Sequence, residues 1–208
     1  MKNQITLKII GLVYVIIGLA AIINTVYYGN LSGILWFCYL AIILIGIGTF
    51  INNPYIILSQ INIIALPSLF WILDFFYFAI TKTPLTGITS YFFNPDFPIL
   101  SKIISLQHLF TFPIALYILY LTKTKKSDKL SSISIILSFL TITIIFFLTK
   151  TLTLAESNIN CAYKPCGNLS FNLIPYPLTW FLIFSIMIII THYTLIKIMT
   201  KKHGRAKN

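Results

Sequence analysis

A single carboxylate, Asp74, lies inside the aromatic and aliphatic run SLFWILDFFYF, residues 68 to 78. A carboxylate at the centre of a bilayer costs about 2.5 to 3.5 kcal/mol on insertion scales, so its side chain should face protein or a cavity. His108, on the next apolar segment of the chain, is the expected partner, because imidazole and carboxylate can exchange a proton or share a hydrogen bond. We therefore expect Asp74 and His108 either to link two helices or to line a cavity that binds a solute or relays a proton.

Two further polar residues share the helical faces of this pair. Steps of seven residues back from Asp74 reach Gln60 and Asn53, with a drift of only about 20° per step around the helix. Ser105 precedes His108 by three residues and so lies on the same face. The candidate site is a polar cavity, open to the outer side, formed by Asp74, His108, Gln60 and Ser105.

Two cysteines, Cys161 and Cys166, lie in the segment ESNINCAYKPCGNLS. Their separation lets the chain turn back to disulfide geometry, and we predict a disulfide if this loop lies outside the cytoplasm. A metal site or a redox pair is the alternative. Zinc needs more ligands than a loop with no histidine and one acid, Glu156, supplies, and the spacing is not the C-x-x-C of thiol oxidoreductases. We expect no metal here.

The elements that must position these residues are membrane-spanning helices. The chain has 208 residues, of which 58% are hydrophobic and 9% charged, against about 25% charged in soluble domains. A span needs about 20 apolar residues. The sequence therefore predicts an all-α bundle forming a single integral membrane domain, with kinks at Pro67 and Pro113. Its six expected spans are 5–27, 31–51, 54–80, 99–121, 132–152 and 177–199.

The distribution of basic residues predicts the orientation. Six spans put both termini on one side, and eleven of the 15 lysines and arginines fall on that side. Because positive loops stay in the cytoplasm, we expect a multi-pass protein of the cell membrane with both termini cytoplasmic. The same clusters explain the net charge of +11 through contact with membrane lipids, without nucleic acid as a partner.

No catalytic or cofactor motif is present in the sequence, and we expect no cofactor. Three functions fit. The favoured one is a small permease or membrane-embedded subunit that binds a small solute. The second is an enzyme acting on a lipid, with Asp74 and His108 as acid and base. The third is an assembly partner for another membrane protein. The connection 81–98 is expected to lie at the membrane interface or to form a lid over the cavity.

Overall fold

The computed structural model describes residues 2–122, 127–152, 158–166 and 175–205, and the regular elements in these ranges are all helical. The expected all-α bundle is confirmed. The α-helices are α1 (Lys2–Tyr27), α2 (Phe37–Phe50), α3 (Pro54–Thr81), α4 (Ser90–Phe93), α5 (Ile99–Ser105), α6 (Gln107–Leu121), α7 (Asp128–Leu152) and α8 (Tyr176–Arg205). Two short 3₁₀ helices are η1 (Leu31–Leu35) and η2 (Ile159–Cys161).

Among the described residues, five segments are long and apolar enough to cross a membrane: Asn3–Tyr27, Pro54–Thr81, Ile99–Leu121, Asp128–Thr151 and Tyr176–Met199. The second expected span, 31–51, differs. Its extended residue Trp36 separates η1 from α2, which has 14 residues and a length of about 21 Å at 1.5 Å per residue. This is shorter than the roughly 30 Å of a hydrocarbon core.

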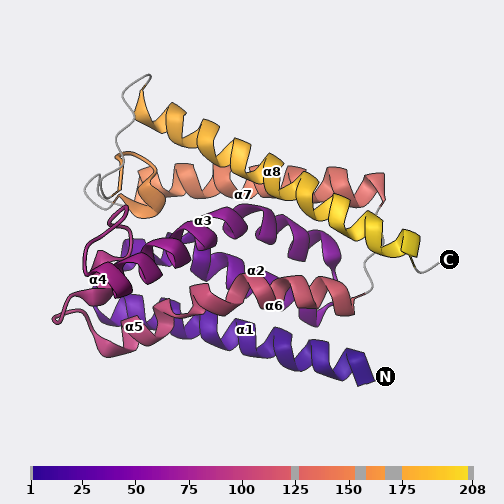
Figure 1. The fold of residues 1–208 in the computed structure, drawn as a ribbon, viewed down its shortest axis with the longest axis horizontal. Coiled ribbons are helices and arrows are strands. Elements are labelled where there is room, and N and C mark those ends of the chain that lie inside the picture. The colour runs from indigo at the N-terminus through magenta and orange to yellow at the C-terminus, as the bar shows by residue number, and fades with distance from the viewer. Residues whose placement is uncertain (1, 123–126, 153–157, 167–174, 206–208) are drawn as a thin grey trace.

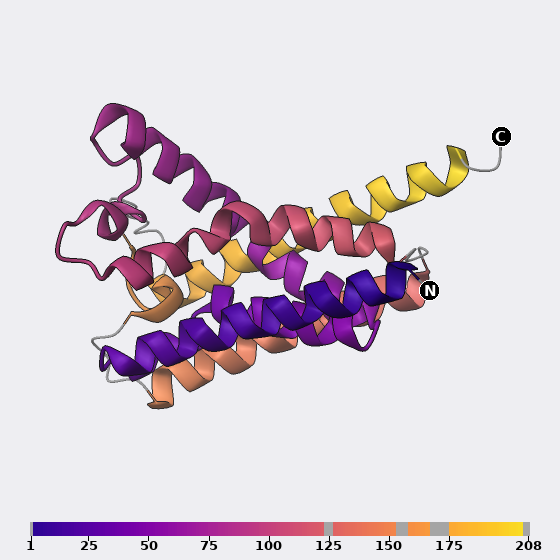
Figure 2. The ribbon, with the colours of Figure 1, turned by 90° about the horizontal axis from the view of Figure 1, so that it is seen from below.

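Helix α1 begins and helix α8 ends at the same end of the bundle (Figure 1). The opposite end carries α4, η2 and the connections around them, and is called the loop end below. Figure 2 shows that the half of α3 nearest the loop end diverges from α1 and α7.

Helices α1 and α2 approach so closely that glycine is required at their crossing. A Cβ atom on Gly46 would lie 2.7 Å from the carbonyl oxygen of Gly11, and one on Gly11 would lie 2.8 Å from that of Gly46. Real Cβ atoms do not come so near to a backbone. Small residues serve the same purpose in membrane bundles generally, where packing rather than the hydrophobic effect holds helices together.

Helix α3 is defined by its caps. Asn53 accepts hydrogen bonds from the backbone N–H groups of Tyr55 and Ile56, at 3.0 and 3.3 Å, which fixes the first turn. Lys82 adopts a left-handed conformation (φ 59°) and ends the helix. Pro67 lies inside α3 and Pro113 inside α6, whereas the interruption of the expected fourth span falls at Leu106, between α5 and α6.

Candidate functional site

A cavity of about 1140 Å³ lies at the loop end, between α1, α2, α3, α5, η2 and α8. Most of its lining is aromatic or aliphatic. None of the described lining residues carries a formal charge, although the chain as a whole has a net charge of +11. The aromatic residues of the lining are Tyr28, Trp36, Phe37, Tyr39, Phe70, Trp71, Tyr91, Phe97, Tyr176, Trp180 and Phe184.

The cavity reaches the lipid-facing surface between α3 and α8. Phe70 on α3 is 52% exposed, and Ile186 and Ile190 on α8 are 47% and 52% exposed, yet all three also line the cavity. Apolar side chains that are at once exposed and part of a lining mark its rim.

The polar part of the lining is centred on His108. Its half-buried ring stacks on Trp71 with the ring centroids 4.8 Å apart and an angle of 24° between the planes. Among the described residues, neither nitrogen of His108 has a hydrogen-bond partner. The Trp71 indole N–H donates to the Tyr91 hydroxyl at 3.0 Å, which holds the indole, and with it the stacked imidazole, in place.

Tyr91 belongs to α4, outside the spanning helices. Burial raises the pKa of its phenol, and interactions with Ser105 and Trp71 offset that rise in part. The phenol therefore stays protonated. Ser105 lines the cavity, as expected, and its own hydroxyl donates to the backbone oxygen of Ser101 at 2.9 Å.

Beside Ser105, α1 contributes a second polar group. The side-chain amide of Asn24 donates to the Ser101 hydroxyl at 2.9 Å, and its Oδ1 atom has no partner among the described residues. Asn24 and Ser101 both line the cavity. Polar groups from α1, α5 and α6 thus contribute to the lining of a chamber whose other residues are mostly apolar.

Asp74 faces a loop and not this chamber. Its Oδ1 accepts the backbone N–H groups of Thr86 and Gly87 at 2.6 and 3.3 Å, and its Oδ2 accepts the N–H and the hydroxyl of Thr89 at 2.8 and 2.6 Å. These four donors surround a side chain that is 0% exposed. Such a ring of N–H groups stabilises a carboxylate that has been removed from water.

Two of the four expected cavity residues are therefore placed differently from the sequence-based expectation. Within the described part of the chain, Asp74 makes no bond to His108. The connection after α3 folds back over the helix, and its backbone N–H groups occupy the carboxylate oxygens of Asp74 instead. Gln60 is buried in the second turn of α3, where its amide donates to the Ser59 hydroxyl at 3.2 Å. Neither Asp74 nor Gln60 lines the cavity, whereas His108 and Ser105 do.

Aromatic stacking fixes the connection 82–98 over α3. Phe93 stacks on Phe78 with centroids 4.2 Å apart, and Phe92 meets Phe75 edge to face at 5.0 Å. Thr86, Gly87, Ile88, Tyr91, Phe97 and Pro98 from this connection all line the cavity. The connection, anchored by Asp74, thus forms one wall of the cavity.

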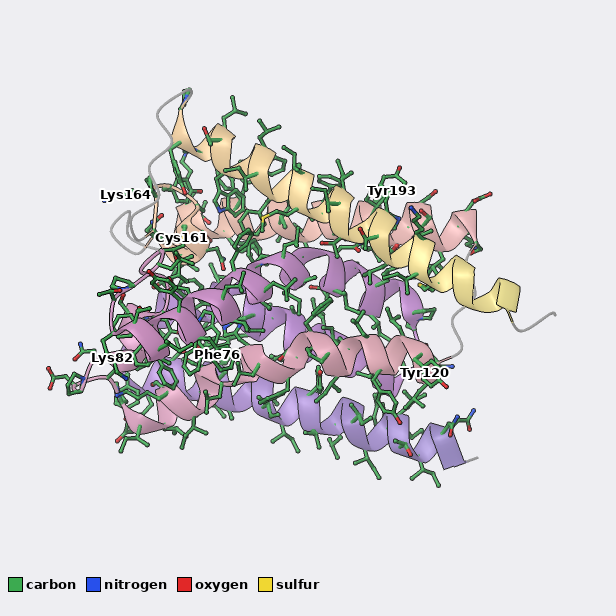
Figure 3. All side chains as sticks on the ribbon, viewed as in Figure 1. Phe76, Lys82, Tyr120, Cys161, Lys164 and Tyr193 are labelled. Carbon is green, nitrogen blue, oxygen red and sulfur yellow. A yellow bond between two sulfur atoms is a disulfide. The ribbon has the colours of Figure 1, made fainter. Side chains whose placement is uncertain are left out.

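The cysteine loop also contributes to the wall of the cavity. Cys161 and Cys166 form a disulfide with an S–S distance of 2.09 Å and a Cα–Cα distance of 5.4 Å, and both line the cavity. Figure 3 shows Cys161 and Lys164 at the loop end with Lys82, while Tyr120 and Tyr193 lie toward the other end. Glu156 lies outside the described residues.

Asn160, next to this disulfide, joins three elements. Its Oδ1 accepts the backbone N–H of Phe37 at 2.9 Å, and its amide donates to the Leu35 carbonyl at 2.8 Å. Its backbone oxygen accepts the Trp180 indole N–H at 2.8 Å. One asparagine thus bonds both sides of the break between η1 and α2, and also holds α8.

A second polar cluster lies away from the cavity, between α3, α7 and α8. Asn62 contacts His192 and Ser138, each at 3.1 Å, and the other ring nitrogen of His192 lies 2.7 Å from the Ser131 hydroxyl. Both nitrogens of His192 are therefore bonded. This cluster ties three spanning helices together.

Sequence reasoning missed Trp71, Asn24 and Asn160. Trp71 lies three residues before Asp74 on the same face of α3, but its aromatic side chain does not stand out from the other apolar residues of that segment. Asn24 was identifiable as the one amide in the apolar run of α1. No local signal marks Asn160, since its partners are distant in sequence.

No protein-family model matches this chain, and no curated protein or solved structure is significantly similar to it.

Proposed function

We propose that this protein binds an amphiphilic molecule within the membrane, as a membrane-embedded binding protein. The observation that carries the proposal is the uncharged, largely apolar cavity at the loop end, with its rim of exposed apolar residues between α3 and α8. This proposal keeps the membrane-embedded binding subunit favoured by the sequence, but replaces the small solute by an amphiphilic molecule. A lipid-like molecule would bury most of its surface against the aromatic and aliphatic side chains that make up most of this lining.

The size of the cavity supports this proposal. Ligand pockets are typically about 300 to 1,000 Å³, and apolar burial contributes about 25 cal/mol per Å². A cavity of about 1140 Å³ has room for a single-chain amphiphile with its polar end covered. An acid–base mechanism on a lipid receives less support, because the carboxylate of Asp74 is engaged by Thr86, Gly87 and Thr89.

The proposal includes a location. We place the protein in a cell membrane as a multi-pass protein, with the loop end outside and both termini in the cytoplasm. The basic residues of the sequence favour that orientation, and the disulfide of the loop end suits an oxidising outer face. The cavity would then open to the outer half of the bilayer.

The chain carries its own reporter for a test. All three tryptophans of the sequence, Trp36, Trp71 and Trp180, line the cavity. Liposomes holding the protein would receive four probes that share one brominated alkyl chain and end in a hydroxyl, a methyl ether, a carboxylate or a trimethylammonium group. At low mole fraction, at least one probe should quench tryptophan fluorescence saturably, and its unbrominated counterpart should reverse the quenching.

A variant that fills the cavity distinguishes quenching by a bound probe from quenching by random collisions between probe and protein in the bilayer. Cys38 is half-buried and lines the cavity, so Cys38→Phe should weaken the saturable component about tenfold or more. Ile136→Phe, on the exposed face of α7, adds the same ring elsewhere and should leave it unchanged. Quenching that rises linearly for all four probes, in the wild type as in Cys38→Phe, would contradict the proposed function.

A further inference from the structure

We infer that the amphiphile ends in an uncharged hydroxyl group, which is bound by the imidazole of His108. This inference rests on the proposed function and adds the chemical class of the ligand. A long-chain or isoprenoid alcohol and a monoacylglycerol belong to this class, whereas phospholipids and fatty acids do not.

The charge of the lining limits the ligand first. The chain has 15 lysines and arginines, yet none of the residues that line the cavity is a lysine, arginine, aspartate or glutamate. A charged headgroup enclosed here would lose its hydration without meeting a counter-ion, at a cost of several kcal/mol. Asp74 of α3 does not serve as a counter-ion, because its carboxylate already accepts four hydrogen bonds from Thr86, Gly87 and Thr89. The polar end of the ligand must therefore be neutral.

The hydrogen-bonding capacity of His108 indicates which neutral headgroup the ligand carries. An imidazolium at His108 would likewise lack a counter-ion, so the neutral ring is the form expected in the cavity. A neutral imidazole offers one N–H donor and one acceptor, and neither nitrogen is used by the described residues. A hydroxyl group can donate and accept, and so can pair with either ring nitrogen, whereas an ether can only accept.

The ring of His108 is held ready for such a contact. Trp71 stacks on it and is itself fixed through the indole N–H bond to Tyr91. A ring with fixed orientation loses little entropy when it binds. The apolar chain of the ligand would extend from this point past Phe70 and Ile190 into the hydrocarbon, because these two residues form the exposed rim.

The four brominated probes test the inference directly. In the wild type, the hydroxyl probe should bind at least tenfold more tightly than the carboxylate and trimethylammonium probes, and several-fold more tightly than the methyl ether. His108→Phe keeps a ring for stacking on Trp71 but removes both nitrogens. In this variant the preference for hydroxyl over methyl ether should disappear, while affinity for the methyl ether stays within about twofold of wild type.

A conservative variant and a distant one complete the design. His108→Asn restores a donor and an acceptor, and should recover part of the preference for hydroxyl over methyl ether. Phe110→Leu, at a partly exposed position on the same helix outside the lining, should keep the full preference. Saturable binding of any probe combined with equal affinity for charged and hydroxyl heads would overturn this inference but leave amphiphile binding standing. A hydroxyl preference that survives His108→Phe would remove His108 from the site.

Discussion

Asp74 illustrates what decides the role of a single residue in this protein. Its charge inside an apolar run correctly signals that it must be surrounded by protein, but the sequence does not say by what. Its partners are mainly backbone N–H groups of residues 86–89, which every residue except proline possesses. Side-chain patterns could therefore predict the burial of Asp74 and not its donors.

Replacing Asp74 by Asn should destabilise the protein. An amide presents two N–H donors where the carboxylate had an acceptor, so at least part of the four-donor ring would face another donor. Hydrogen bonds to charged groups are worth about 1.5 to 3 kcal/mol each, and we expect a loss of about 2 kcal/mol or more. For a chain of this size that is roughly a 4 to 8 °C lower melting temperature in detergent.

The matched control is Asp96→Asn, because Asp96 is exposed in the same connection. It should melt within about 1 °C of wild type, as surface substitutions usually do. If Asp74→Asn melts as wild type does, the carboxylate does not anchor the connection, and its retention would point to a direct role in function.

At the scale of elements, most of the helices could be predicted and the breaks could not. Hydrophobic length locates α1 and α3 to within three residues at each end, since the bilayer imposes that length, whereas α7 begins four residues before its expected span and α8 continues six residues past its own. The interruption of the second expected span depends on Asn160, a residue that is remote in the sequence. The cavity depends on these breaks, because α2, α5 and η2 all contribute to its lining.

Removing the Asn160 side chain should loosen the start of α2. Asn160 has a positive φ of 55°, so Asn160→Gly deletes the cap without straining the backbone. Loss of a capping side chain costs about 0.5 to 2 kcal/mol. Hydrogen exchange should accelerate at the Phe37 amide and the next turn, while the exchange in α3 stays unchanged.

Asn52→Gly is the control for this experiment. Asn52 has nearly the same backbone conformation, with φ 56°, and lies exposed at the end of α2. It should leave exchange near Phe37 as in wild type. Equal exchange in the two variants would mean that water can replace the cap.

At the scale of the whole molecule, class and fold follow from composition, whereas the cavity does not. Net hydrophobicity identifies a helical bundle, but a chamber arises from how α3 diverges from its neighbours and from two connections that pack inward (Figure 2). Those are properties of packing between distant segments. Of the four expected site residues, His108 and Ser105 reach the cavity, because both lie on one face of a segment that borders it.

The proposed orientation predicts which residues water-soluble reagents can reach in intact cells. Lys164→Cys, at the loop end, should react with a membrane-impermeant maleimide, and Asn3→Cys should react only after the cells are permeabilised. Both positions are exposed, and Cys38 would be replaced by Ala in each case. The opposite pattern of labelling would reverse the orientation. Reaction of both without permeabilisation would contradict a location of the two ends on different sides.

The bond between Asn160 and Phe37 also sets an order of assembly during synthesis. The two residues are 123 positions apart, so the ribosome has made α3 to α7 before the residue that completes the first turn of α2 exists. Helix α2 is therefore made long before its capping residue, and the wall of the cavity stays incomplete until Asn160, Cys161 and Cys166 have been added to the chain. A nascent chain that stops before residue 160 lacks both the cap of α2 and this part of the cavity wall, whatever its helices have already buried.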